Sequence, residues 1–258
     1  MSTAYRLVWF QHFHKAAGSS IVELAKMNGE QFWPNHNNGN PLDDSGNELE
    51  LWEYSNQELA SFVDLCEQKG VTFVATEWGA PDIEYLASDN RVVLVTCIRA
   101  PLERYVSNFY YDLHNGYTAA RTLYDYEATR NRAFTASNYY CRVLADIKDC
   151  SIKISAAEFE IAASLLTKFD VCSRLEDGLD ELSHSLSWSH KSVHSNRTST
   201  SFSNLAKLLI RGKLKLSYLR LKYPKQKPSA EFVAYFDAAN TWDTKLYRQI
   251  SEFKKIGV

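Results

Sequence analysis

The sequence contains no apolar run of the roughly 18 residues that a helix needs to cross a bilayer. The first apolar stretch, Tyr5 to Phe10, begins so near Met1 that no signal peptide is expected ahead of it. The five cysteines are odd in number and lack the paired spacing of a metal site, so we expect reduced, mostly buried thiols and no metal. These absences predict a cytoplasmic protein without a transmembrane segment.

Acidic residues are missing from one long part of the chain. No Asp or Glu lies between Glu181 and Glu231, whereas ten Lys or Arg lie between Lys191 and Lys227. The stretch from 43 to 67 is acid-rich instead, although the whole chain carries a net charge of only −2. One side of the molecule is therefore expected to attract anions that the other repels.

What is present fits an α/β domain. The 258 residues are 45% hydrophobic and 13% aromatic, enough to bury a full core in one domain, or in one domain with an appendage. Short apolar runs rich in β-branched residues predict buried strands, and apolar residues at helical spacing predict helices. The predicted strands are 5–10, 71–76 and 91–98, the helices 21–27 and 58–69, and a surface loop rich in Asn and Gly spans 35–47.

Residues 12–20, with the sequence HFHKAAGSS, join the first predicted strand to the first predicted helix. In such a unit the N–H groups of the loop and of the first helical turn point at one spot and favour an anion. Gly18 permits the backbone to approach an anion closely, and Lys15 adds a full positive charge. Ser19 and Ser20 add hydroxyl donors and a helix N-cap. The loop therefore predicts a phosphate or sulfate site, and a surface lysine beside an ordinary helix start is the alternative.

A second anion site is expected where the strand 91–98 ends. Arg99 stands at the strand exit, and Pro101 suits the first turn of a helix. Ser107 then lies about two turns along that helix. One arginine and one serine can converge on a single anion there.

The loop is not a Walker A motif, because glycines are missing before Lys15 and no Ser or Thr follows it directly. It resembles instead the 5′-phosphosulfate loop H-I-P-K-T-G-G-T-S of carbohydrate sulfotransferases. The sequence RAPLERYVS at 99–107 resembles the 3′-phosphate motif of that family, R-D-P-[LV]-E-R-x-x-S. His14 replaces a proline of the pattern, Ala17 replaces a glycine and Ala100 replaces an aspartate.

The resemblance extends more weakly over most of the chain, and is greatest to the heparan-sulfate 2-O-sulfotransferase and chondroitin-sulfotransferase branch. Similar motifs lie at 138–144, 169–177 and 240–247, and 193–198 is similar to the H-x-N-x-[ST] lid over the nucleotide. The resemblance implies one sulfotransferase domain over residues 1–258, with a P-loop-like three-layer fold and a central, mainly parallel sheet flanked by helices. It implies 3′-phosphoadenosine-5′-phosphosulfate (PAPS) as donor and its desulfonated product PAP. The residues implied to bind the nucleotide are Lys15, Ala16, Ala17, Gly18, Ser19, Ser20, Arg99, Ser107, Asn196, Arg197 and Thr198.

The implied reaction moves a sulfuryl group to an acceptor hydroxyl, on a carbohydrate, by in-line displacement. Lys15 would neutralise charge on the leaving phosphate. Glu77 aligns with the histidine base of the 2-O branch and is the expected general base, since it follows the strand 71–76 at the sheet edge where open α/β sheets bind ligands. We expect it beside the strand that ends at Arg99, with Trp78 shielding it and raising its pKa. A solvated loop acid is the alternative, and His12 and His14 are rival bases that are more simply structural.

The segment 204–228 fits the resemblance least. Its leucines predict a basic amphipathic helix or helix pair, inserted into the domain. A solvated face, contact with an anionic acceptor such as a glycan, and attachment to a membrane surface are its three interpretations, in that order. Nucleic acid is not expected, because no exposed aromatics are interleaved with the charges.

Two other functions stay open. A P-loop nucleotide kinase would share the fold, but the missing Walker glycines and the pair of Arg99 and Ser107 disfavour it. A non-catalytic nucleotide- or glycan-binding module would keep the anion sites and need no base. Neither the acceptor nor the oligomeric state follows from the sequence.

Overall fold

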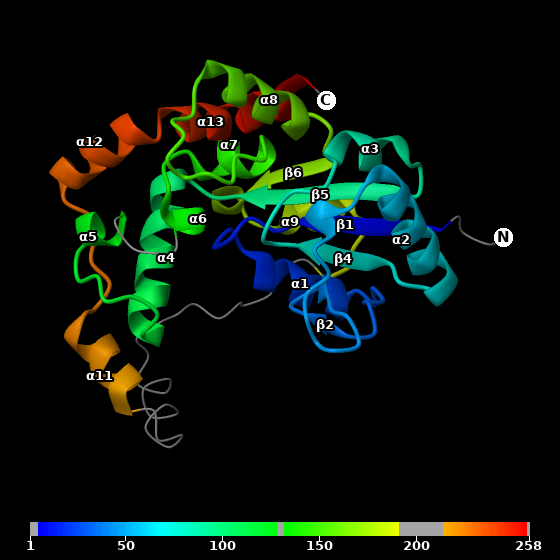
Figure 1. The fold of residues 1–258 in the computed structure, drawn as a ribbon, viewed down its shortest axis with the longest axis horizontal. Coiled ribbons are helices and arrows are strands. Elements are labelled where there is room, and N and C mark those ends of the chain that lie inside the picture. Colours follow the sequence, from blue (N-terminus) through cyan, green and yellow to red (C-terminus); the bar gives the residue numbers. More distant parts are fainter. Residues whose placement is uncertain (1–4, 128–131, 191–213, 257–258) are drawn as a thin grey trace.

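A computed structural model describes residues 5–127, 132–190 and 214–256 of the chain (Figure 1). Four strands form one parallel sheet in the order β4-β1-β5-β6. Their bounds are β1 (Leu7–Gln11), β4 (Phe73–Thr76), β5 (Val92–Ile98) and β6 (Val171–Arg174). The predicted α/β fold with a parallel sheet is confirmed, as are the three predicted strands.

Apolar side chains project from both faces of this sheet, because successive residues of a strand point to opposite sides. Leu7 and Trp9 of β1 join one buried cluster, and Val8 and Phe10 join another. The first cluster packs against α2 (Asn56–Lys69), α3 (Ile83–Ser88), α7 (Tyr139–Leu144), α8 (Ala156–Leu166) and α13 (Thr241–Ile256). The second packs against α1 (Gly18–Met27) and α9 (Asp180–Ser185). Helices therefore cover both faces of the strands.

The remaining elements lie around this layer arrangement. A third buried cluster joins α4 to α5 and α12 at one end of the sheet (Figure 1). The further elements are η1 (Leu51–Glu53), α4 (Pro101–Asn115), α5 (Leu123–Glu127), α6 (Arg132–Thr135), η2 (Leu175–Asp177), α11 (Leu214–Lys222) and α12 (Ala230–Ala239).

Local chemistry explains where the predicted helices begin and end. Ser55 and Glu58 form a reciprocal capping box at the start of α2, and Gly70 ends the helix with a φ of 69°. Pro101 is the first residue of α4, where its missing N–H costs nothing, and Gly116 ends that helix with a φ of 76°. The predictions of a helix over 58–69 and of a helix opening at Pro101 are confirmed.

Two expectations about neighbouring segments were wrong. The stretch 35–47 is not simply a loop, because it contains a small hairpin of β2 (His36–Asn37) and β3 (Asn40–Pro41). Gly39 lets this hairpin lie against β4, since a Cβ built there would lie 3.1 Å from Ala75 Cβ. The strand before Glu77, β4, pairs with β1 and not with the strand that ends at Arg99, because β1 lies between them.

Part of the basic segment is helical, as predicted. α11 packs on α4, and the chain after it is fixed where Tyr223 O lies 2.8 Å from His114 Nε2. The backbone N–H of Gln226 donates to Tyr110 OH at 2.8 Å. Residues 204–213, and the expected lid residues Asn196, Arg197 and Thr198, lie outside the described residues.

None of the five cysteines, all of which lie in the described residues, forms a disulfide, and three of them are buried, as expected. None of the helices in the described ranges combines the length and the apolar character that crossing a bilayer requires.

Candidate functional site

The loop after β1 has a strained backbone and leads into an uncapped helix. Lys15 and Ala17 have φ values of 63° and 69°, a region that costs a non-glycine residue about 1–3 kcal/mol. Ala17 is the N-cap of α1, and no side chain caps the helix. Ser19 and Ser20 lie inside the first turn, so the prediction that they provide the cap was wrong. The N–H groups of Ser20 and Ile21 donate to Ala17 O, so those of Gly18 and Ser19 are the ones available to an anion at this helix start.

Gly18 is required here for a reason that the sequence did not reveal. A Cβ built on Gly18 would lie 1.7 Å from Nε2 of His12, so any side chain would displace the imidazole. His12 is only 4% exposed and stacks on Phe10, with ring centroids 5.5 Å apart. The imidazole therefore lies directly beneath the start of α1 and supports the loop.

Lys15 is the cation of this loop. Its Nζ lies 3.8 Å from the centroid of the Tyr111 ring, a cation–π contact. Burial and the nearby charge of Lys225 lower the pKa of Lys15 to about 8, although Glu77 and Asp112 oppose the shift. A lysine held this way gains more from a bound anion than a solvated lysine does.

Arg99 follows β5, the strand beside β1, so the loops after these two strands lie side by side at the carboxyl edge of the sheet. The Tyr140 hydroxyl fixes its backbone, accepting from Arg99 N at 3.0 Å and donating to Arg99 O at 2.8 Å. In the described part of the chain Nε of Arg99 is buried without a hydrogen-bond partner. The guanidinium lies 3.6 Å from the exposed carboxylate of Glu103. Ser107 is half-buried in the second turn of α4, and no hydrogen bond between described residues joins it to Arg99.

Lys225 belongs to the same cationic group, and the motif analysis did not single it out. Burial and the charges of Arg99 and Arg220 lower its pKa. It acts in turn on Lys15, so the positive charges lie close together although they come from three separate segments. The only sequence signal was the density of basic residues, which does not say which of them faces the loop.

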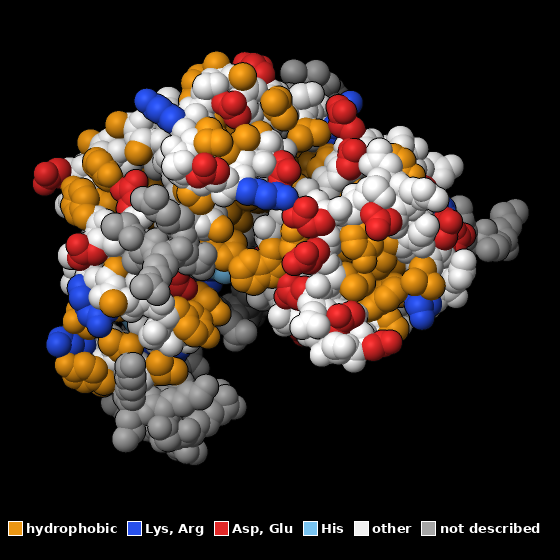
Figure 2. Space-filling view, in the orientation of Figure 1, with side chains coloured by type: hydrophobic (Ala, Val, Ile, Leu, Met, Phe, Trp, Pro, Cys, Tyr) orange, Lys and Arg blue, Asp and Glu red, His pale blue; other side chains and the backbone are white. Residues whose placement is uncertain are grey.

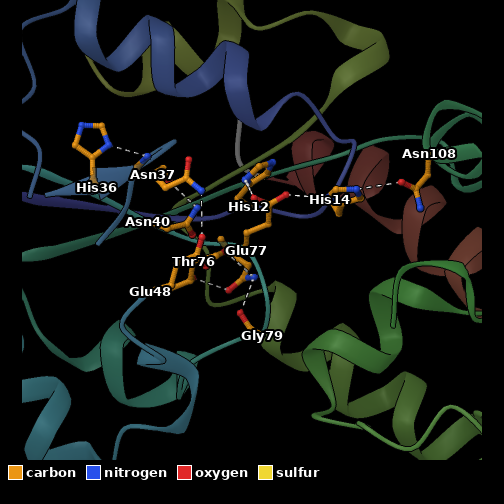
Figure 3. A network of polar contacts seen from close by, with 12 residues as sticks. His12, His14, His36, Asn37, Asn40, Glu48, Thr76, Glu77, Gly79 and Asn108 are labelled. Atoms are coloured by element: carbon orange, nitrogen blue, oxygen red, sulfur yellow. Dashed lines mark hydrogen bonds and ion pairs between the residues drawn. The ribbon is translucent and has the colours of Figure 1, made fainter. Parts of the chain in front are cut away.

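Glu77 lies on the other side of the loop, at the end of β4 (Figure 3). Its Oε1 is 2.8 Å from Nδ1 of His14, and its Oε2 is 3.3 Å from Nδ1 of His12. Burial raises the pKa of Glu77, but the two imidazoles outweigh burial and hold this pKa well below its usual range. The expectation that Trp78 raises the pKa was wrong, because Trp78 is 53% exposed and the histidines dominate.

His14 joins Glu77 to Asn108, a residue that the sequence analysis missed. Nε2 of His14 lies 3.0 Å from Oδ1 of Asn108, which is 1% exposed (Figure 3). The ring stacks on Phe134 at 4.2 Å, and burial lowers the pKa of His14 despite the opposing charge of Glu77. The amide of Asn108 can offer oxygen or nitrogen, so it fits the charged and the neutral ring alike.

Glu48 is a second carboxylate in this network, and sequence reasoning did not find it. Asn37 Nδ2 donates to its Oε1 at 3.3 Å (Figure 3). Burial raises the pKa of Glu48, and the charge of Glu77 adds to this effect. Two neighbouring carboxyl groups therefore have pKa values shifted in opposite directions, a pattern typical of acid–base sites.

Comparisons with other proteins add no further evidence. No family model matches the chain, and no curated protein matches it.

Proposed function

We propose that the protein is a PAPS-dependent sulfotransferase with a P-loop-like fold, acting on a hydroxyl acceptor. The observation that carries the proposal is the grouping of Lys15, Arg99 and Lys225 beside an uncapped helix start. This grouping supplies several positive charges to a ligand with more than one anionic group. The buried, unpartnered Nε of Arg99 fits an anionic oxygen for the same reason.

The roles of these residues follow from their positions. The loop N–H groups and Lys15 face the 5′ side of the donor, where the leaving phosphate gains charge as the bond from its oxygen to sulfur breaks. Arg99 and Ser107 hold the 3′-phosphate, and Lys225 adds charge between the two. Binding of the remote phosphate then positions the reacting group, as in other transferases that work by orientation.

Glu77 is the proposed general base. The acceptor oxygen forms its bond to sulfur as its proton passes to the carboxylate, and the electron pair of the broken bond stays on the phosphate. The lowered pKa keeps Glu77 ionised throughout the physiological range. His12 and His14 hold its two oxygens, so they are positioning residues for the carboxylate.

A non-catalytic nucleotide-binding module is the second candidate. The observation in its favour is the strongly lowered pKa of Glu77, because a carboxylate stabilised by two imidazoles is a weak base. Such a module would use the same cations and would not turn over its ligand.

Two measurements test the proposal. Isothermal calorimetry with PAP and with ATP, each without metal, is expected to give tight binding of PAP and weak binding of ATP. Incubation with sulfur-labelled PAPS and a panel of hydroxyl acceptors is expected to yield a labelled product. Preference for ATP indicates a kinase, and PAP binding without turnover on any acceptor indicates the module.

A further inference from the structure

A groove of about 770 Å³ opens on the side of the sheet covered by α3 and α8. Aromatic side chains form part of its wall, and four carboxylate residues lie along it. These residues are Trp52, Tyr54, Asp82, Glu84, Asp146 and Glu160. The sequence analysis assigned no role to any of them.

The groove begins on the turn that follows Glu77 in the chain. Ala80 and Pro81 line it, three and four residues after Glu77. Trp52 reaches back over the same turn, because a Cβ built on Gly79 would lie 2.6 Å from Trp52 Cγ. Gly79 O accepts from Nε2 of Gln11 at 3.1 Å, which ties the turn to β1. A molecule seated in the groove would thus lie against the turn that follows the carboxylate residue.

The charge of the groove is opposite to that of the nucleotide site. None of the described residues lining it is a lysine or an arginine. Two of its four carboxylates have a lysine within ion-pair distance: Lys168 lies 4.0 Å from Glu84, and Lys148 lies 3.7 Å from Asp146. Figure 2 shows acidic side chains over α3 and the elements beside it. The groove therefore carries more negative than positive charge, which disfavours an anionic acceptor.

We propose that this groove receives the acceptor, and that the acceptor is a hydroxylated molecule carrying positive charge, of the amino-sugar class. The carboxylates supply the attraction, and the faces of Trp52 and Tyr54 supply stacking surface for rings and ammonium groups. The inference rests on the proposed function and replaces the anionic glycan among its acceptors. The proposed anion site and the groove would then be connected by the segment from Glu77 to Pro81.

Binding of three tetrasaccharides tests this inference without turnover. The probes are a glucosamine tetramer, an N-acetylglucosamine tetramer and a galacturonic acid tetramer, which are positive, neutral and negative versions of one chain length. Calorimetry is done below neutral pH, where the amines are protonated. The glucosamine tetramer is expected to bind tightest, to lose affinity with added salt, and to quench indole fluorescence through Trp52.

A double variant, Asp146→Asn with Glu160→Gln, removes two exposed charges from the groove. Asparagine tolerates the φ of 52° at position 146, so the backbone there is not strained. Affinity for the glucosamine tetramer is expected to fall about fivefold, with PAP affinity unchanged. The matched control, Glu23→Gln with Asp237→Asn, neutralises two exposed acids elsewhere and is expected to bind like the unmodified protein.

Tightest binding of the negative tetramer, or equal affinity of the two double variants for the glucosamine tetramer, overturns the inference. PAP binding, measured in the same samples, distinguishes failure of this inference from failure of the proposed function. If the unmodified protein does not bind PAP, the proposed function is contradicted. If it binds PAP but the groove shows no selectivity among the tetrasaccharides, only the choice of acceptor is contradicted.

Discussion

Glu77 lies near two differently charged parts of the molecule. Its charge acts on Lys15, and the acid-lined groove begins at Ala80, three residues further along the chain. His12 and His14 contact one oxygen each and stabilise the ionised carboxylate. The pKa of Glu77 is therefore held well below its usual range.

Replacement of Glu77 by glutamine tests its role as base. Glu77→Gln keeps the shape and removes the proton-accepting group, so kcat is expected to fall at least a hundredfold, since a positioned base contributes about 10²–10⁴-fold. PAP affinity, measured by calorimetry, is expected to stay within a small factor. Glu23→Gln, a change of an exposed acid outside this network, is the control and is expected to keep full activity. An active Glu77→Gln beside an inactive His14→Ala would move the role of base to the histidine.

The pKa of Lys15 makes nucleotide binding depend on pH. Folding lowers this pKa from its ordinary value of 10.5 to about 8, so the buried charge costs stability in full below that pH, and the cost fades as pH rises above it. A bound anion raises the pKa again. At about pH 8.5, PAP binding is therefore expected to take up protons, measured as different apparent enthalpies in buffers of different ionisation enthalpy. Lys15→Arg, which stays charged, should abolish this difference, and an unchanged difference would show that another group titrates.

The close packing of His12 against Gly18 can be tested with single and double variants. Gly18→Ala is expected to destabilise the fold by about 1–3 kcal/mol, because the added Cβ meets the buried imidazole of His12. In a His12→Ala background the same change should cost much less, and the difference gives the coupling free energy from urea unfolding. Equal costs in both backgrounds would place the strain elsewhere in the loop.

At the scale of elements, the short helix α7 connects both anion loops to the C-terminal helix. Tyr139 OH accepts from the backbone N–H of His14 at 3.0 Å, and Tyr140 OH holds Arg99. The helix itself is anchored by Asp243 of α13, whose carboxylate accepts from the N–H groups of Tyr140 and Cys141. A helix with no predicted contact to the ligand thus fixes the backbone of Arg99 and of His14, the residue before Lys15.

Removing one tyrosine hydroxyl tests this arrangement. Tyr140→Phe leaves the N–H and C=O of Arg99 without their partner, a loss of about 1–3 kcal/mol for buried groups. PAP affinity is expected to fall roughly three- to tenfold, with a lower melting temperature. Tyr139→Phe is the matched variant on the same helix, and it should affect the loop 12–20 and turnover more than the Arg99 site. Unchanged PAP affinity in Tyr140→Phe would make the contact purely structural.

The sequence predicted the strands themselves better than it predicted which strands lie side by side. Apolar runs marked β1, β4 and β5 because burial on both faces leaves a pattern in the chain itself. The order of strands leaves no such pattern, so Glu77 was expected beside β5 when β1 lies between them. The hairpin of β2 and β3 was missed because its Asn- and Gly-rich composition also suits a loop.

Prediction of the candidate site had the same limit, because contacts between distant segments leave no pattern in the sequence. Lys15 and Arg99 were predicted as site residues from their motifs, and the structure places them after the adjacent strands β1 and β5. Asn108, Glu48 and Lys225 were missed because their roles depend on contacts between distant segments. The pKa of Glu77 was predicted with the wrong sign because it is decided by two imidazoles that only the fold brings to its oxygens.

At the scale of the whole molecule, a net charge of −2 conceals a strong separation of charge. The described part of the basic segment after residue 190 consists of α11 and the residues that follow it. Two exposed lysines of this part interact with different groups. The Nζ of Lys222 lies over the rings of Tyr218 and Tyr223. Lys225 instead interacts with Arg99 and Lys15.

This difference allows an effect of the overall charge of the segment to be distinguished from a specific contact made by Lys225. If the segment acts only through its overall charge, Lys222→Ala and Lys225→Ala should weaken PAP binding equally, and added salt should remove both effects. We expect Lys225→Ala to lower PAP affinity about fivefold at low salt and to flatten its salt dependence, while Lys222→Ala changes neither. The measurement is a PAP titration at several salt concentrations for each variant. Equal effects of the two variants would favour the interpretation of the segment as a solvated basic face. The proposed nucleotide site would then depend on Lys15 and Arg99 alone.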